Sequence, residues 1–155
     1  KNLILADTPE LKMGIFDYQF TVGHGKEKRV HRVSVVVVQS PGLSVPRCNL
    51  RPERRFLDSI GALLGKQDID FDEHPEFSKA FVLKSDQEEE TRAFFDKGLL
   101  DYFSQHPDIS FELRPGAFLY FRQWARVDPE SKKLQEFLGE GFSLLEAIKE
   151  RQERA

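Results

Sequence analysis

The sequence predicts an α+β fold, a single domain with an antiparallel or mixed β-sheet and about three helices packed mainly on one face. Several short runs alternate apolar and polar residues, which is typical of strands with one buried side. Other runs repeat their apolar residues at helical spacing. The two kinds of run follow one another without the strand–helix–strand order of parallel sheets, and a length of 155 residues favours a single core spanning residues 1–155.

The N-terminal part is predicted to form strands. Residues 3–5 form a short strand, and a longer strand follows at residues 13–22. Alternation places four apolar residues of the longer strand on one face, which we expect to be buried: Phe16, Tyr18, Phe20 and Val22. A glycine-rich loop joins this strand to its partner at residues 29–39. The four valines at 35–38 are apolar on both faces, which predicts a central place in the sheet.

The middle of the chain combines an extended segment, a helix and two short strands. Residues 43–50 are predicted to be extended. Arg51 begins a helix, because Pro and Glu follow it and apolar residues recur at helical spacing until Gly65 ends it. A strand at 68–72 and a second strand at 77–83 flank a turn at 73–76.

The C-terminal part is predicted to hold two helices and a hairpin. One helix starts at Ser85, and Gly98 is a candidate break within it. Strands at 109–113 and 118–127 are joined by a Pro-Gly turn. The last helix follows residue 130, and its polar end at 150–154 is predicted to fray.

Composition excludes several classes of function. The net charge of −3 argues against a general nucleic-acid binder. Cys48 is the single cysteine, so no intrachain disulfide forms, and its apolar surroundings favour a packed side chain over a nucleophile. No apolar run in this sequence is long enough to cross a membrane. No motif points to a cofactor.

Basic residues are concentrated between residues 26 and 55, and acidic residues between 68 and 96. Three interpretations stay open: the two segments neutralise each other, the basic charges are scattered over the surface, or the basic segment binds an anionic lipid surface or an acidic protein partner. The candidate residues for such binding are Lys26, Lys28, Arg29, Arg32, Arg51, Arg54 and Arg55.

The acidic stretch supplies the candidate metal ligands, which are Asp68, Asp70, Asp72 and His74. Carboxylates at every second position of a strand share a face, and hard cations prefer several oxygen ligands. The spacing does not match a calcium-binding EF-hand loop, because the required glycine and the final glutamate are absent. The alternative is a structural junction in which Asp72 and Glu76 accept hydrogen bonds from backbone N–H groups of the turn.

Five segments together resemble a bacterial family of uncharacterised membrane-anchored proteins. The sequences of its members broadly follow the pattern FDY, an aromatic residue, T, G, GK, a variable loop, H and TVV. The matching segments are residues 16–26, 31–36, 50–53, 68–72 and 74–78. The matching segments lie between residues 16 and 78, and each motif is weak when taken alone. Ser34 stands where threonine is common in the family.

The resemblance implies a soluble domain that follows one or more N-terminal membrane helices. The chain begins at Lys1 and not at Met, so we interpret it as part of a longer protein, membrane-associated through its missing N-terminal segment, with this domain on the cytoplasmic side. The resemblance brings no catalytic residues. The leading hypothesis is therefore a non-catalytic binding or scaffolding module, and the alternative is a divalent-metal-dependent hydrolase that uses the acidic stretch.

Overall fold

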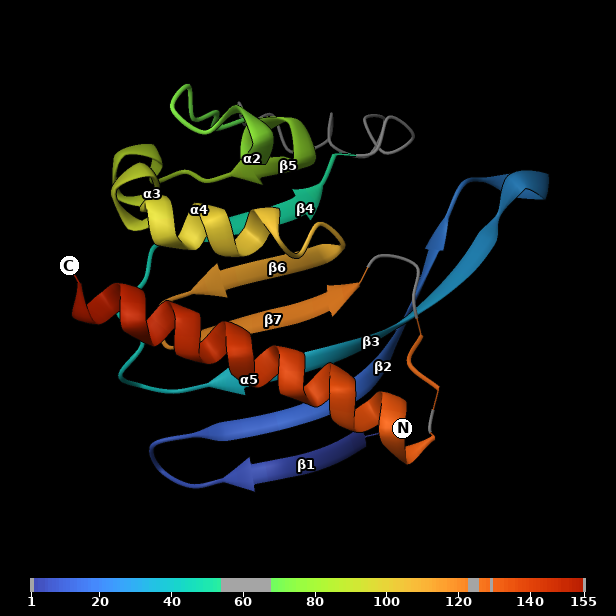
Figure 1. The fold of residues 1–155 in the computed structure, drawn as a ribbon. Helices are drawn as coiled ribbons and strands as arrows, with labels where there is room; N and C mark the ends of the chain where they lie inside the picture. Colours follow the sequence, from blue (N-terminus) through green and yellow to red (C-terminus); the bar gives the residue numbers. More distant parts are fainter. Residues whose placement is uncertain (1, 54–67, 123–125, 129, 155) are drawn as a thin grey trace.

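The computed structural model describes residues 2–53, 68–122, 126–128 and 130–154. In this part of the chain, seven strands form one antiparallel sheet in the order β1-β2-β3-β7-β6-β4-β5, together with four α-helices (Figure 1). The predicted α+β single-domain fold is confirmed. None of the helices in these ranges is both long enough and apolar enough to cross a membrane.

The first half of the sheet is a three-stranded meander. Its strands are β1 (Asn2–Asp7), β2 (Lys12–Val22) and β3 (Arg29–Gln39). β2 and β3 pair along their whole length, from Lys12 opposite Gln39 to Val22 opposite Arg29. Among the described residues, β7 pairs only with the Val35–Gln39 end of β3. The rest of the β2–β3 hairpin therefore extends beyond the sheet.

The second half of the sheet consists of four shorter strands. They are β4 (Cys48–Pro52), β5 (Phe81–Lys84), β6 (Ile109–Arg114) and β7 (Ala117–Arg122). Gly116 has a φ of 78° in the tight turn between β6 and β7, a left-handed conformation that glycine adopts without strain. The predicted Pro-Gly hairpin is thus confirmed. Of the predicted second strand, residues 126 and 127 are not in a strand, and residues 123–125 lie outside the described residues.

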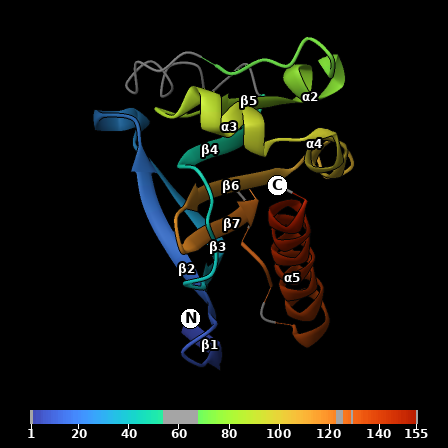
Figure 2. The same ribbon diagram turned by 90° about the vertical axis from the view of Figure 1, so that its left-hand side faces the viewer.

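The helices are α2 (Pro75–Ala80), α3 (Glu88–Phe94), α4 (Lys97–Ser104) and α5 (Ser131–Glu153), and a short 3-10 helix, η1 (Gly25–Glu27), lies at the tip of the β2–β3 hairpin. Figure 2 shows α4 and α5 on the same side of the sheet. Gly141 of α5 lies close to β3, because a Cβ built on it would be 3.1 Å from Val36 Cγ1. The opposite side of the sheet has no described helix against it.

The core is rich in phenylalanine where α2, α4 and β5 meet. Phe77, Phe81, Phe95 and Phe103 are all almost fully buried, and Phe71 packs against them. The ring of Phe77 lies 5.3 Å from that of Phe81 and 6.0 Å from that of Phe95, measured between centroids. Such packed aromatic pairs are worth more than their buried area alone. The predicted junction role of Phe71, Phe77 and Phe81 is consistent with these contacts.

The predicted strand at 77–83 is wrong in its first half. Residues up to Ala80 form α2, and only Phe81–Lys84 are a strand. Pro75 stands in the first turn of α2 with Glu76 beside it, both of which favour a helix start. The predicted strand at 68–72 is also absent, although Ile69 N–H donates to Leu83 O (2.8 Å) at the sheet edge.

Two further predictions change in the structure. Arg51 and Pro52 belong to β4 and do not begin a helix. The remainder of that predicted helix, residues 54–65, lies outside the described residues. On β2, Met13 and Ile15 face the helices and are buried, whereas Tyr18 is 53% exposed. The aromatic face of β2 is therefore the one that no described helix covers, which is the opposite of the expectation.

The predicted helix from Ser85 onward is divided in two, and the last helix does not fray where expected. The break falls at Asp96, two residues before Gly98, because the Asp96 carboxylate accepts a hydrogen bond from Leu99 N–H (2.9 Å) and caps α4. α5 continues to Glu153. The buried Arg151 near its end donates to the carbonyl oxygens of Phe94 (2.7 Å) and Ala93 (2.6 Å), which fixes the last turns.

Candidate functional site

The acidic stretch is built into the structure through its two ends. The carboxylate of Asp68 accepts a hydrogen bond from Leu83 N–H (2.7 Å), so it pairs with the edge of β5. Burial raises the pKa of Asp68 above its usual range, although the Leu83 hydrogen bond acts in the opposite direction. Asp68 thus completes the hydrogen bonding of an edge strand.

The other end of the stretch turns toward α4. His74 Nε2 lies 2.8 Å from Asp101 Oδ1, and Lys97 Nζ lies 2.9 Å from the second oxygen of the same carboxylate. The His74 hydrogen bond, followed by that of Lys97, lowers the pKa of Asp101. His74 and Asp68 are therefore directed at two different elements.

The turn itself is closed by other groups than those predicted. His74 N–H donates to Phe71 O (2.9 Å), and Phe71 N–H donates to the hydroxyl of Ser78 (2.8 Å). The side chains expected to do this, those of Asp72 and Glu76, are exposed. The stretch is a structural junction, but main-chain groups and Ser78 hold it.

The structure does not bring the four candidate metal ligands together. Across the described ranges, which include 68–76, no three His, Cys, Asp or Glu side chains form a group able to hold a metal ion. Asp70 and Asp72 are exposed, and the other two candidates are engaged with β5 and α4. Cys48 is also unsuited to chemistry, because burial raises the pKa of its thiol to about 12 and keeps it protonated at neutral pH.

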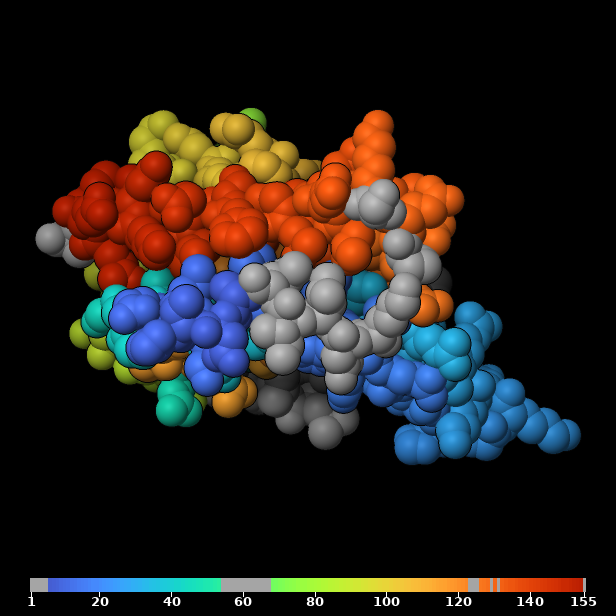
Figure 3. All heavy atoms as spheres, turned by 90° about the horizontal axis from the view of Figure 1, so that it is seen from below, coloured from blue at the N-terminus to red at the C-terminus, as the bar shows by residue number. Residues whose placement is uncertain are grey.

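The projecting part of the β2–β3 hairpin is the most distinctive surface of the molecule. We call residues 17–34 the arm. Figure 1 shows it extending past the rest of the sheet, and Figure 3 shows the same projection from below. Its tip depends on Gly23, which has a φ of 88° and whose added Cβ would lie 2.6 Å from Glu27 O. A larger residue at this position would be strained and would clash.

The base of the arm is braced by a network of hydrogen bonds. Asp17 accepts from the Ser34 hydroxyl (2.8 Å) and from Arg126 Nε (3.0 Å), and Val127 N–H donates to the Ser34 oxygen (2.9 Å). Burial acts to raise the pKa of Asp17, but the hydrogen bonds from Ser34 and Arg126 outweigh it and hold the pKa below its usual range. The arm is therefore attached to the body through charged and polar contacts on both strands.

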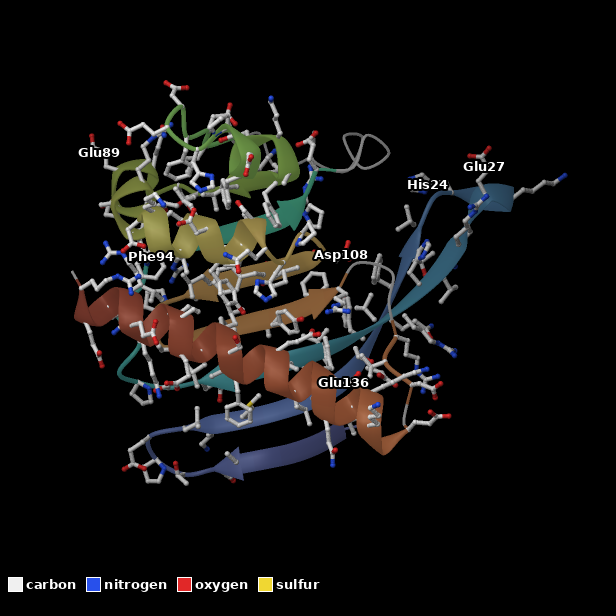
Figure 4. The ribbon with its side chains drawn as sticks, viewed as in Figure 1. His24, Glu27, Glu89, Phe94, Asp108 and Glu136 are labelled. Atoms are coloured by element: carbon white, nitrogen blue, oxygen red, sulfur yellow. The ribbon has the colours of Figure 1, made fainter. Side chains whose placement is uncertain are left out.

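The surface of the arm combines positive charge with apolar side chains. Figure 4 shows His24 and Glu27 at the tip, away from the body of the molecule. The exposed basic residues of the arm are Lys26, Lys28, Arg29 and Arg32, against the single acidic residue Glu27 beyond the braced Asp17. Tyr18 and Val30 are about half exposed, at 53% and 54%. Basic and apolar groups thus lie on one protruding element.

The seven predicted basic residues divide into three groups. Lys26, Lys28, Arg29 and Arg32 gather on the arm, as just described. Arg51 lies apart from them, in β4 on the face of the sheet turned away from α4 and α5. Arg54 and Arg55 lie outside the described residues. The structure therefore groups only part of the predicted basic site.

A groove that was not predicted from the sequence lies on the face of the sheet that no described helix covers, which we call the uncovered face. Its volume is about 690 Å³, and the strands β2, β3, β4, β5, β6 and β7 all contribute to its lining. Most of its lining is apolar, with side chains such as Phe16, Val35 and Phe121 from β2, β3 and β7. The charged residues Arg51, Lys84 and Glu112 lie on β4, β5 and β6. The aromatic alternation of β2 was the signal for this surface, but it was assigned to the core.

Comparison with known proteins gives no assignment. The chain matches no protein-family model, no curated protein and no solved structure.

Proposed function

We propose that this domain is a non-catalytic binding module that places its arm against an anionic membrane surface. The observation that carries the proposal is the arm, a braced two-stranded element that projects from the sheet and bears four exposed basic residues. Each Lys or Arg near an anionic lipid surface contributes about 1 kcal/mol of binding free energy. The acidic residues of the body do not lie on this element.

The apolar side chains of the arm suit the same target. Tyr18 is half exposed, and its ring stacks along the strand on that of Phe20, which in turn stacks on His31 at 5.5 Å between centroids. Aromatic side chains with a polar end are favoured at the boundary between lipid headgroups and acyl chains. Val30 adds further exposed apolar surface near the tip.

The family resemblance supports a tether that holds the domain at the membrane, on its cytoplasmic side. A bound anchor would raise the local concentration of the arm at the lipid surface, so that weak individual contacts suffice. A hydrophobic segment encoded upstream of Lys1 in the parent gene would support the tether. A parent gene without such a segment would contradict it and would leave the lipid-binding role of the arm to be tested separately.

The arm is expected to bind vesicles that contain phosphatidylglycerol and to ignore vesicles of phosphatidylcholine alone. Replacing Lys26, Lys28 and Arg29 by glutamine should weaken binding to the anionic vesicles by about two orders of magnitude, since about 1 kcal/mol is lost for each charge. Raising the salt concentration should weaken the binding of the parent chain in the same direction. Vesicle sedimentation measures both effects.

A matched control removes the same number of charges from α5. Lys132, Lys133 and Lys149 are exposed on this helix, and their replacement by glutamine should leave vesicle binding within about threefold of the parent, since their charges belong to α5 and not to the arm. Equal loss in the control variant, or equal binding of the parent to neutral and anionic vesicles, would contradict the proposal. Binding to an acidic protein without any binding to vesicles would assign the arm to a protein partner.

A further inference from the structure

We propose that the groove on the uncovered face of the sheet binds a fatty acid, with its carboxylate at Arg51 and Ser110 and its alkyl chain toward β2. This site is separate from the basic tip of the arm. It does not require that the arm bind lipid, and each can be tested without the other.

The groove has the volume that an amphipathic ligand needs, and its charged lining residues lie apart from most of its apolar ones. Its volume of about 690 Å³ lies within the range of small-molecule sites, which is roughly 300–1,000 Å³. Its charged side chains lie on β4, β5 and β6, whereas the side chains that β2, β3 and β7 contribute are aromatic or aliphatic. One end is therefore polar and the other apolar, with a few polar groups converging on one place.

The strand register places the lining residues side by side, from the apolar end of the groove to its charged end. On the uncovered face, Phe16 pairs with Val35, Val35 with Phe121, and Phe121 with Ser110. Leu50 of β4 pairs with Phe111 of β6. The next residues along these antiparallel strands are Arg51 and Ser110, which are therefore neighbours. Three strand spacings separate Ser110 from Phe16, a span of about 14 Å, which accommodates an extended alkyl chain.

Two buried polar atoms at the head of this path have no hydrogen-bond partner. Among the described residues, these are Arg51 Nη1 and Ser110 Oγ, both of which belong to residues lining the groove. Ser110 is only 1% exposed. A buried guanidinium N–H without an acceptor is costly, and each such group in a folded protein calls for an explanation.

A carboxylate at this end of the groove would satisfy both atoms once the two buried side chains turn toward it. It accepts a charge-assisted hydrogen bond from the Arg51 guanidinium and a second bond from the Ser110 hydroxyl. A neutral apolar molecule would fill the groove but leave both donors without acceptors. A cationic amphiphile would place its charge against that of Arg51. Glu112 lies at the same end of the groove, so it is the two donors without acceptors, Arg51 and Ser110, that favour an anionic head group on an apolar chain.

Isothermal titration with monomeric octanoate, decanoate and laurate tests the proposal. Affinity is expected to rise by about fourfold for each added methylene, since each buried methylene contributes about 0.8 kcal/mol. Dodecanol should bind about tenfold or more weakly than laurate, because it lacks the charge that Arg51 pairs with. This comparison needs only the parent chain.

Two variants locate the head group. Arg51→Met is expected to weaken laurate binding by about tenfold or more and to leave dodecanol binding unchanged, and Ser110→Ala should weaken laurate by several-fold in the same manner. Lys132→Met, on α5, is the control and should bind laurate like the parent. Thermal melts establish that each variant is folded; if Arg51→Met is not, Ser110→Ala and the laurate–dodecanol comparison decide. Failure of laurate to bind, equal binding of acid and alcohol, or unchanged affinity in both groove variants would overturn the proposal.

Discussion

Replacing Phe77 by alanine is expected to lower the free energy of unfolding by about 3–5 kcal/mol, since large-to-small substitutions of buried phenylalanine cost this much. Phe77 belongs to α2, is fully buried at 0% exposure, and packs against Phe81 of β5 and Phe103 of α4. Its ring is within 6.4 Å of those of Phe71, Phe81, Phe95 and Phe103, measured between centroids. No single neighbour can move into the space without giving up its own contacts, so the cavity would persist.

Urea denaturation of the parent and the variant measures this effect directly. Phe142→Ala is the matched control, because Phe142 is the same residue type on α5 but is 44% exposed. Its replacement should cost about 1 kcal/mol or less, as is usual for surface positions. Equal stabilities of the Phe77 variant and the parent would show that the junction at residues 68–81 is held by something other than this aromatic cluster.

The second large effect is expected at Arg151. Its replacement by methionine should lower the free energy of unfolding by about 2–4 kcal/mol, because the carbonyl oxygens of Ala93 and Phe94 would lose their donors in a buried place. Arg151 Nε also lies 3.4 Å from Asp96 Oδ2, and Asp96 caps α4. The substitution would therefore loosen the contact between the end of α5 and the α3–α4 junction.

Arg154→Met separates this role from simple loss of charge. Arg154 also pairs with Asp96, through Nε at 3.1 Å, but its side chain is 45% exposed. Exposed ion pairs contribute little to stability, so this variant should be nearly as stable as the parent. The two variants are compared by chemical denaturation at neutral pH. A similar loss in both would mean that the buried carbonyl contacts of Arg151 carry no special weight.

Much of the sheet was predictable because alternation is a local signal. The strands at 13–22 and 29–39 and the Pro-Gly hairpin were found at nearly the observed places. The helix at 77–80 was not predicted, because Phe77 between the polar residues Glu76 and Ser78 fits the alternation of a strand and one turn of a helix equally well. Tertiary packing decides that case, through the aromatic cluster that surrounds Phe77.

The site was harder to predict than the fold. Local acidity drew attention to the stretch at 68–76, but the directions of Asp68 and His74 depend on β5 and α4, which are distant in the sequence. The aromatic face of β2 was assigned to the core because alternation cannot show which side the helices cover. The groove joins strands from both halves of the chain, and so no single sequence segment contains it.

Hydrogen–deuterium exchange of the domain with and without anionic vesicles tests the central claim most directly, because it shows which surface meets the membrane. The account predicts slower exchange at residues 24–32 of the arm and unchanged exchange at residues 68–76. Protection of the acidic stretch, or vesicle binding that leaves the exchange of the arm unaltered, would contradict the account.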